Sequence, residues 1–236
     1  MSADLARRAL VTGAARGIGA AIAQRLRDDG FEVVTLDVAE GCDLQADVAN
    51  GALDDPVFGE VDAVVSNAAI TTTIAPAHRM TQEQWRRDID VNLTGAFRVV
   101  QACLGGMRER RFGRIVVISS GAAQSGLPGQ VAYSASKAGL IGMVQTIAAE
   151  NVARGITANA VLPGLIETEN VLAMPPEVLE RVRAQMPSGR MGSPAEVAGL
   201  VAYLASEESG YVTGQAIGID GGMALNTMSL TGAPRT

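Results

Sequence analysis

Short uninterrupted runs of hydrophobic residues alternate along this chain with longer segments in which hydrophobic residues recur every three or four positions. The short runs predict buried strands, and the first of them are 9–12, 31–36 and 63–66. Between the first two, residues 17–27 place four apolar side chains on one face of a predicted helix, namely Ile18, Ala21, Ile22 and Leu26. The chain therefore opens with strand, glycine-rich turn, helix and strand, which is a βαβ unit.

The same alternation continues through the rest of the chain. Further strands are predicted at 115–118, 156–162 and 216–219, and helices at 81–110, 131–154 and from 194 onward. Thr81 with Gln84 three residues later has the capping-box pattern of a helix start. Ser193 is a typical helix cap, followed by a proline in the first turn. Strands that alternate with helices predict one parallel sheet with helices on both faces.

Composition narrows the class of protein. Of the 236 residues, 47% are hydrophobic and 19% are charged, which excludes an intrinsically disordered chain. Lys and Arg number 19 against 25 Asp and Glu, and aromatic residues make up 3%, so no nucleic-acid partner is expected. No linker or internal repeat divides the chain. We therefore expect a single domain over residues 1–225, followed by a loose C-terminal tail over 226–236.

The chain also lacks the sequence signals of a membrane or secreted protein. No apolar segment is long enough for a membrane span, and the first residues lack the apolar stretch of a secretory signal. Cys42 and Cys103 show neither metal-binding nor redox spacing, which is typical of a protein in a reducing compartment. We expect a cytoplasmic protein without a metal site or a membrane partner.

Glycines cluster where the first strand meets the first helix. Gly13, Gly17 and Gly19 have the spacing G-x-x-x-G-x-G. Glycines let the backbone approach a pyrophosphate closely, and a helix N-terminus supplies free N–H groups and a positive dipole end. Asp37 ends the next strand, where a carboxylate can accept hydrogen bonds from ribose hydroxyls. Either feature alone is typical of an ordinary turn, but together they predict a dinucleotide site.

A second group of candidate residues follows the strand 115–118. Tyr133 and Lys137 are four residues apart on a predicted helix, so their side chains lie on the same face. Small residues surround them, and Lys137 therefore has little reason to be a solubilising charge. Ser120 comes directly after the strand, and ligands of open parallel sheets bind at the carboxyl ends of strands. These three side chains are candidates for proton transfer.

With these motifs the sequence resembles the short-chain dehydrogenase/reductase family over nearly its whole length. The resemblance rests on residues 12–19, Ser66 to Ala69, Asn92, Ser120, Tyr133, Lys137, Pro163, Gly164 and Thr168. Residues 189–196 and 212–222 most resemble the branch of 3-oxoacyl-thioester (acyl-carrier-protein) reductases. The family implies a Rossmann-type doubly wound sheet in one nicotinamide-dinucleotide-binding catalytic domain, which interconverts a secondary alcohol and a ketone.

The resemblance also implies roles for individual residues. Tyr133 would act as the general acid/base, and Ser120 would hold the substrate carbonyl. Lys137 would bind the nicotinamide ribose and lower the pKa of Tyr133, by about three units if its ammonium lies ~4 Å away. Asn92 would hold a water in the proton relay. The other cofactor contacts would come from Gly13, Arg16, Gly17, Ile18, Gly19, Asp37, Asp47, Val48, Asn67, Pro163, Gly164, Ile166 and Thr168.

The sequence departs from the family pattern in three places. Ala69 stands where the family usually has a glycine close to the cofactor. Residues 47–62 are too few for the full helix that the family has there, and leave room for a turn or two. Arg16 stands where members that use the phosphorylated cofactor often have a basic residue, whereas Asp37 opposes a 2′-phosphate.

Three functional hypotheses remain. The first is an oxidoreductase that acts on a small alcohol or ketone with NAD(H), and the second is an NADPH-dependent 3-oxoacyl-thioester reductase. The third is a nucleotide-sensing protein without catalysis, which would not need both Tyr133 and Lys137. Because Asp37 is followed by Glu40 and by no basic residue, we expect a preference for NAD(H), with NADP(H) as the alternative. The family further implies a homo-oligomer, a dimer or a tetramer, built partly on the helix 131–154.

Overall fold

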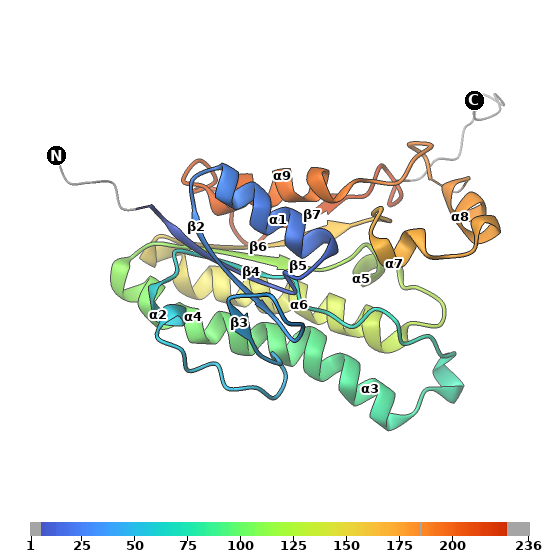
Figure 1. Ribbon diagram of the computed structural model, residues 1–236, viewed down its shortest axis with the longest axis horizontal. Helices are drawn as coiled ribbons and strands as arrows, with labels where there is room; N and C mark the ends of the chain where they lie inside the picture. Colours follow the sequence, from blue (N-terminus) through green and yellow to red (C-terminus); the bar gives the residue numbers. More distant parts are fainter. Residues whose placement is uncertain (1–5, 185, 226–236) are drawn as a thin grey trace.

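Seven parallel strands form one sheet, with the order β3-β2-β1-β4-β5-β6-β7 (Figure 1). The computed structural model describes residues 6–184 and 186–225. Its strands are β1 (Arg8–Thr12), β2 (Glu32–Asp37), β3 (Leu44–Gln45), β4 (Ala63–Ser66), β5 (Gly113–Ile118), β6 (Ile156–Pro163) and β7 (Ala216–Ile219). The chain order reverses between β1 and β4, and ligands of open α/β sheets bind beside such a switch point.

Helices cover both faces of this sheet (Figure 1). On one face lie α1 (Gly17–Asp28) and α9 (Pro194–Ala205), and on the other lie α4 (Ala96–Arg110) and α6 (Val131–Asn151). The helix α3 (Gln82–Ile89) leads into α4 through the π-helix η2 (Asp90–Gly95), and α6 ends in the 3-10 turn η3 (Val152–Arg154). The shorter elements are α2 (Val57–Glu60), η1 (Ala77–Arg79), α5 (Ala122–Ser125), α7 (Glu169–Leu172) and α8 (Pro176–Arg183).

The alternation of side chains along the strands divides the core into two layers. Leu10 of β1 and Val64 of β4 belong to the layer under α4 and α6, whereas Val11 and Val65 belong to the layer under α1 and α9. All four side chains are fully buried. A strand that is covered on both faces needs no polar side, which explains why the hydrophobic runs in the sequence are uninterrupted.

The structure confirms the fold that the sequence predicts and places the main element boundaries within about two residues of the expected ones. The capping box of α3 is present, since the Thr81 hydroxyl accepts a hydrogen bond from the Gln84 N–H at 3.1 Å. Residues 47–62 hold only the single turn of α2. The short elements β3, α5, α7 and α8 were not predicted, and the expected tail over 226–236 lies outside the described residues.

Within residues 6–184 and 186–225, no helix has the length and apolar character that crossing a membrane requires. The same residues contain no group of three or more His, Cys, Asp or Glu side chains that could hold a metal ion. Both cysteines are free thiols. Cys103 is buried, and burial raises the pKa of its thiol to about 12, so this thiol has the character of a small hydrophobic side chain.

Candidate active site

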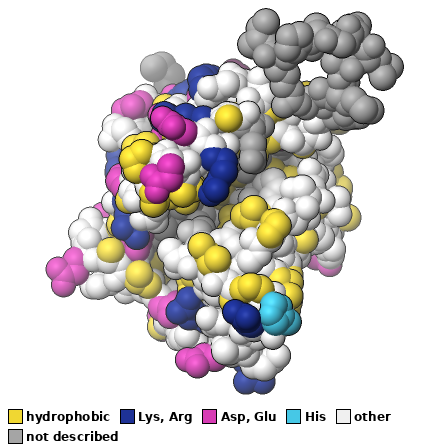
Figure 2. Space-filling model, turned by 90° about the vertical axis from the view of Figure 1, so that its right-hand side faces the viewer, with side chains coloured by type: hydrophobic (Ala, Val, Ile, Leu, Met, Phe, Trp, Pro, Cys, Tyr) yellow, Lys and Arg dark blue, Asp and Glu magenta, His cyan; other side chains and the backbone are white. Residues whose placement is uncertain are grey.

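A cavity of about 1950 Å³ opens at the carboxyl ends of the strands, on the side of the molecule that Figure 2 shows. It extends from the glycine-rich loop after β1, past the end of β5, to α7 and α8. Hydrophobic side chains lie near this hollow, with arginine side chains and the single histidine below them (Figure 2). Every residue that the sequence analysis proposed for the site lines this cavity, except Gly19 and Asn92.

The glycine-rich loop has a backbone that only glycine fits. Gly13 and Gly17 have φ angles of +65° and +58°, in the left-handed region. A Cβ on Gly19 would lie 2.0 Å from the carbonyl oxygen of Gly13, so this glycine permits contact between α1 and the loop rather than lining the cavity. The N-terminus of α1 has neither a side-chain cap nor an acidic residue in its first turn. These features fit a diphosphate, because the N–H groups of the first turn remain available to an anion.

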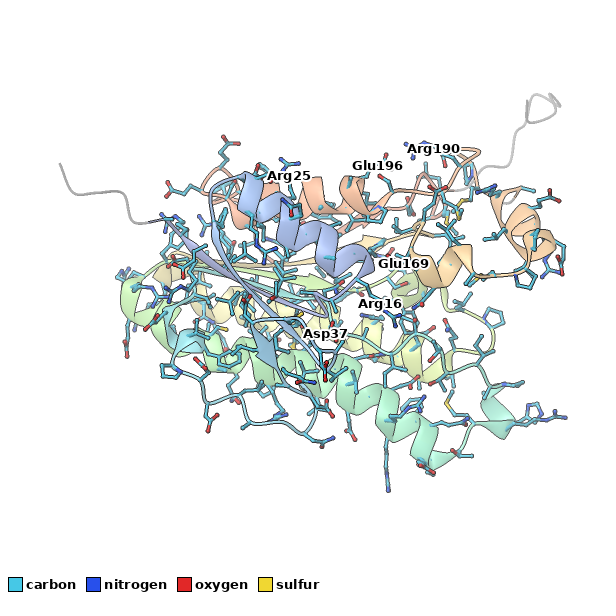
Figure 3. All side chains as sticks on the ribbon, in the orientation of Figure 1. Arg16, Arg25, Asp37, Glu169, Arg190 and Glu196 are labelled. Carbon is cyan, nitrogen blue, oxygen red and sulfur yellow. The ribbon has the colours of Figure 1, made fainter. Side chains whose placement is uncertain are left out.

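Asp37 lies at the end of β2 beside this loop (Figure 3). Its carboxylate accepts hydrogen bonds from the backbone N–H groups of Ala15, at 3.0 Å, and Ala39, at 3.1 Å. One bond falls on each oxygen, so each oxygen can still accept a bond from a ribose hydroxyl. Arg16 also lines the cavity and is exposed, and it forms none of the ion pairs among the described residues. No ion pair among the described residues therefore offsets the charge of the Asp37 carboxylate.

Asp47 and Val48 form the wall next to Asp37. The Asp47 carboxylate accepts a hydrogen bond from the N–H of Ala49 at 2.9 Å, and the Val48 carbonyl accepts one from the Arg98 guanidinium at 2.6 Å. The side chain of Val48 is buried. The loop is thus held in place by its own polar groups, and its contact with adenine stays a prediction.

Asn67 ties the end of β4 to the glycine-rich loop. Its Nδ2 donates to the carbonyl oxygens of Thr12, at 3.1 Å, and Gly13, at 3.0 Å. A direct role of Asn67 in holding a cofactor stays a prediction, but its side chain clearly shapes the loop. Ala69 lines the cavity without a positive φ and is exposed, so its methyl group is accommodated where the family pattern has glycine.

Tyr133, Lys137 and Ser120 come together in the middle of the cavity. The ammonium of Lys137 donates a hydrogen bond to the carbonyl of Ile118 at 2.7 Å and lies 5.7 Å from the centre of the Tyr133 ring. Burial lowers the pKa of Lys137 to about 8. The Ser119 hydroxyl donates to the Lys137 carbonyl at 2.8 Å, which fixes this turn of α6 against the end of β5.

The expected lowering of the Tyr133 pKa by Lys137 is not found. Burial raises the pKa of the Tyr133 phenol, and hydrogen bonding with Ser120 offsets this only in part. The expectation placed the ammonium ~4 Å from the phenol, whereas here Lys137 is directed at the Ile118 carbonyl. Tyr133 therefore keeps its proton at neutral pH, which suits a general acid that donates to a carbonyl oxygen.

Asn92 lies behind the cavity wall rather than in it. It is buried within the π-helix η2, and its side chain forms two hydrogen bonds with the backbone of Ile70. Its Oδ1 accepts from the Ile70 N–H at 2.7 Å, and its Nδ2 donates to the Ile70 carbonyl at 3.0 Å. The side chain thus positions the segment after β4, and the proton-relay role stays a prediction. One-turn π-helices are frequent at functional sites.

The end of β6 forms the opposite wall. Pro163 ends the strand, and the Gly164 N–H donates to the carbonyl of Ile219 in β7 at 3.0 Å. A Cβ on Gly164 would lie 2.8 Å from Cα of Asp220, so a larger residue would push this wall apart. Ile166 is buried beneath the wall, and Thr168 starts α7. Their contacts with a nicotinamide stay predictions.

Two groups of wall residues were missed by the sequence analysis. Ile74, Leu127, Met174 and Val178 are apolar side chains from three separate loops and α8, and no spacing in the sequence connects them. Glu169 at the start of α7 also lines the cavity. The only signal for it was its place in an acidic and basic segment after β6, which did not distinguish it from its charged neighbours.

Comparisons with known proteins agree with this geometry. Residues 55–224 match the family model described as enoyl-(acyl carrier protein) reductase, and residues 7–53 match the model described as short chain dehydrogenase. The chain is 44% identical to acetoacetyl-CoA reductase of Rhizobium meliloti, over 92% of this chain and 98% of that protein. It is 41% identical to the 3-oxoacyl-[acyl-carrier-protein] reductase FabG of Escherichia coli, over 92% and 97% respectively.

A solved structure supports the fold independently. The crystal structure of a candidate gluconate dehydrogenase from Agrobacterium tumefaciens superimposes with a TM-score of 0.84 and 31% sequence identity. The match covers 94% of this chain and 98% of that one. The similar proteins thus include both reductases of acyl thioesters and a dehydrogenase of a sugar acid.

Proposed function

The chain belongs to the short-chain dehydrogenase/reductase family of enzymes that act on carbonyl and CH–OH groups, and we propose that it reduces a ketone to a secondary alcohol, reversibly, with NAD(H). The observation that carries this proposal is that Ser120, Tyr133 and Lys137 line the same cavity as the glycine-rich loop. The nicotinamide, when bound, supplies the hydride. The chain's own residues supply the binding site, the orientation and the proton.

The proton transfer would proceed from Tyr133. Its phenol is protonated at neutral pH because burial raises its pKa, so it can donate to the carbonyl oxygen as negative charge develops there. Ser120 would hold the same oxygen with its hydroxyl. The ammonium of Lys137 uses one of its three donors on Ile118, which leaves two for the cofactor ribose. In the reverse direction Tyr133 would first have to release its own proton to solvent, and the phenolate would then accept the proton of the alcohol.

The preference for NAD(H) is supported by the surroundings of Asp37. A 2′-phosphate would meet a like charge, which costs several kcal/mol when desolvated. Asp37 also engages the N–H groups of Ala15 and Ala39, two donors that a phosphate could otherwise use. Arg16 favours NADPH as the cofactor, as in the second candidate, because it lines the same part of the cavity without an ion pair among the described residues.

A 3-oxoacyl thioester is the substrate class that the similarities support best. Two of the similar proteins are named for reductions of this class. The apolar side chains Ile74, Leu127 and Met174 at the mouth of the cavity are partly exposed and could cover an acyl chain.

The decisive experiment is a kinetic comparison of both cofactors on one substrate panel. We would measure kcat/KM with NADH and NADPH on acetoacetyl-CoA, a longer 3-oxoacyl thioester and a simple ketone. The expected result is a preference for NADH of about tenfold or more, equivalent to about 1.4 kcal/mol. Asp37→Ala should reduce that preference, whereas Glu40→Ala, which removes a nearby charge outside the cavity, should leave it unchanged. A wild-type preference for NADPH would favour the second candidate.

A further inference from the structure

The carboxylate of Glu169 lies at the N-terminus of α1, where the glycine-rich loop would hold a diphosphate (Figure 3). A Cβ placed on Gly17 would be 3.7 Å from Oε2 of Glu169 and 3.4 Å from Cγ2 of Thr168. Gly17 is the first residue of α1, and both Gly17 and Glu169 line the cavity. The start of α7 thus packs against the start of α1.

This position is favourable for a carboxylate only as long as no other anion is present. The first turn of α1 has free N–H groups, no cap and no acidic residue of its own, so its positive end attracts the Glu169 side chain. A diphosphate would bind to the same N–H groups. Two anions cannot share this one helix terminus without strong repulsion, so the carboxylate has to move when a dinucleotide enters.

We propose that Glu169 competes with the cofactor diphosphate for the N-terminus of α1 and thereby sets the affinity for the dinucleotide. This inference rests on the proposed function only in taking a dinucleotide as the ligand. Glu169 is exposed and begins a single helical turn, so its side chain can swing into solvent without unfolding a larger element.

The competition also connects the two halves of the cavity. The turn of α7 leads to Met174 and to Val178 of α8, which line the cavity where we place the acyl substrate. Glu169 therefore stands at the base of the segment that carries this wall. Glu169 is in this sense a residue that sets cofactor affinity, and it takes no part in the proton transfer.

The test compares Glu169→Gln with Glu177→Gln by fluorescence titration of NADH at low salt. Both changes remove one negative charge, but Glu177 lies on α8 and does not line the cavity. Glu169→Gln should lower the Kd for NADH by about two- to fivefold, which is about 0.4–1 kcal/mol, and Glu177→Gln should not. ADP-ribose has the diphosphate but no nicotinamide, and should show the same gain in a calorimetric titration.

The role of charge can be separated from a change of shape by adding salt. At about 1 M salt, where the Debye length is about 3 Å, the difference between wild type and Glu169→Gln should largely disappear. An unchanged or higher Kd in Glu169→Gln would overturn the inference, as would a gain for NADH that ADP-ribose does not share. A wild-type protein that binds neither ligand would instead contradict the proposed function.

Discussion

Burial acts in opposite directions on the two ionisable side chains at the centre of the site. It raises the pKa of the Tyr133 phenol and lowers the pKa of the Lys137 ammonium to about 8. In each case the uncharged form is favoured, because a low-dielectric environment penalises charge. The result near neutral pH is a protonated phenol one helical turn from a lysine that is close to losing its proton.

Removing the Tyr133 hydroxyl should stop the chemistry and leave binding intact. Tyr133→Phe keeps the ring and its packing but has no proton to transfer. We expect kcat to fall by at least about 10²-fold, the usual size of a general acid/base contribution, while the Kd for NADH changes little. The measurement is steady-state turnover in both directions together with a fluorescence titration. A variant with more than half of the wild-type turnover would exclude Tyr133 as the proton donor.

The pKa of Lys137 predicts an alkaline limit to activity. Below about pH 8 the side chain is charged, and above it the neutral amine gives less support to a developing phenolate on Tyr133. kcat/KM for ketone reduction should therefore decrease as the pH rises through about 8. In Lys137→Arg the guanidinium stays charged, so this decrease should move to higher pH in a pH–rate profile. If the pH–rate profile of Lys137→Arg is the same as that of the wild type, the alkaline decrease must come from another group.

The Lys137 side chain also affects the stability of the fold. Rising pH should lower activity through this group but increase its contribution to stability. Its pKa is about 8 in the folded protein and 10.5 without burial, so between these values the unfolded chain binds more protons. The contribution of Lys137 to the free energy of unfolding therefore increases as the pH rises from about 8 to 10.5.

At the scale of secondary-structure elements, the long helices were predictable because their hydrophobic residues recur with a clear period, and the buried strands because each is an uninterrupted hydrophobic run. The short elements were not: β3 has two residues and α7 has four, too few to show a period of either kind. The π-helix η2 was also missed, since an extra residue in a helical turn leaves no mark in composition. Asn92 was assigned to the proton relay from the family resemblance alone, and no sequence pattern indicated that its side chain bonds to the backbone of Ile70.

The site was predictable where backbone geometry depends on residue type, as at Gly13 and Gly17 with their positive φ angles. The direction of the Lys137 side chain was not, because it depends on a carbonyl of β5 that only the tertiary structure brings near. The walls formed by Ile74, Leu127 and Met174 come from separate loops. No local pattern relates residues that meet only through the fold.

The contact between α1 and the glycine-rich loop should tolerate no side chain. In Gly19→Ala the new methyl group would lie 2.0 Å from the Gly13 carbonyl, a backbone atom that cannot move without distorting the loop. We expect a loss of about 1–3 kcal/mol in unfolding free energy and a weaker affinity for NADH. Gly105→Ala on α4, where nothing lies within 4 Å, is the matched control.

Gly105→Ala should leave the unfolding free energy unchanged or increase it by up to about 1 kcal/mol, since alanine has a higher helix propensity than glycine. Denaturant unfolding and NADH titration of both variants test the contrast. Equal stability of Gly19→Ala and wild type would show that α1 can shift away from the loop.

At the scale of the whole molecule, α6 has small or apolar residues on a face that the single chain leaves exposed. Ala135, Ala138, Gly142 and Ala149 lie on this face, and the neighbouring α4 exposes Phe97 to 44%. Contiguous exposed apolar surface is typical of a protein–protein contact, so we expect a second copy of the chain to cover it. Close approach of two helices requires small residues at the contact.

Sedimentation should therefore show a dimer or a tetramer of the 24.3 kDa chain at micromolar concentration. Ala149→Arg would place a charge in the contact and should shift the protein towards the monomer. Gln24→Arg adds the same charge on α1, on the other face of the sheet, and should leave the assembly unchanged. A wild-type protein that sediments only as a monomer would contradict this prediction.

The π-helix η2 fixes the number of residues between α3 and α4. Each residue of a helix turns the chain by about 100°, so a one-residue deletion in 90–95 that restored regular α-helix would rotate α3 by that angle relative to α4. Asp88, which is buried and accepts a hydrogen bond from the Thr73 hydroxyl at 2.7 Å, would leave its partner. Natural changes in chain length are therefore to be sought in the surface loops, such as the one that joins β2 to β3, and not between Gln82 and Arg110.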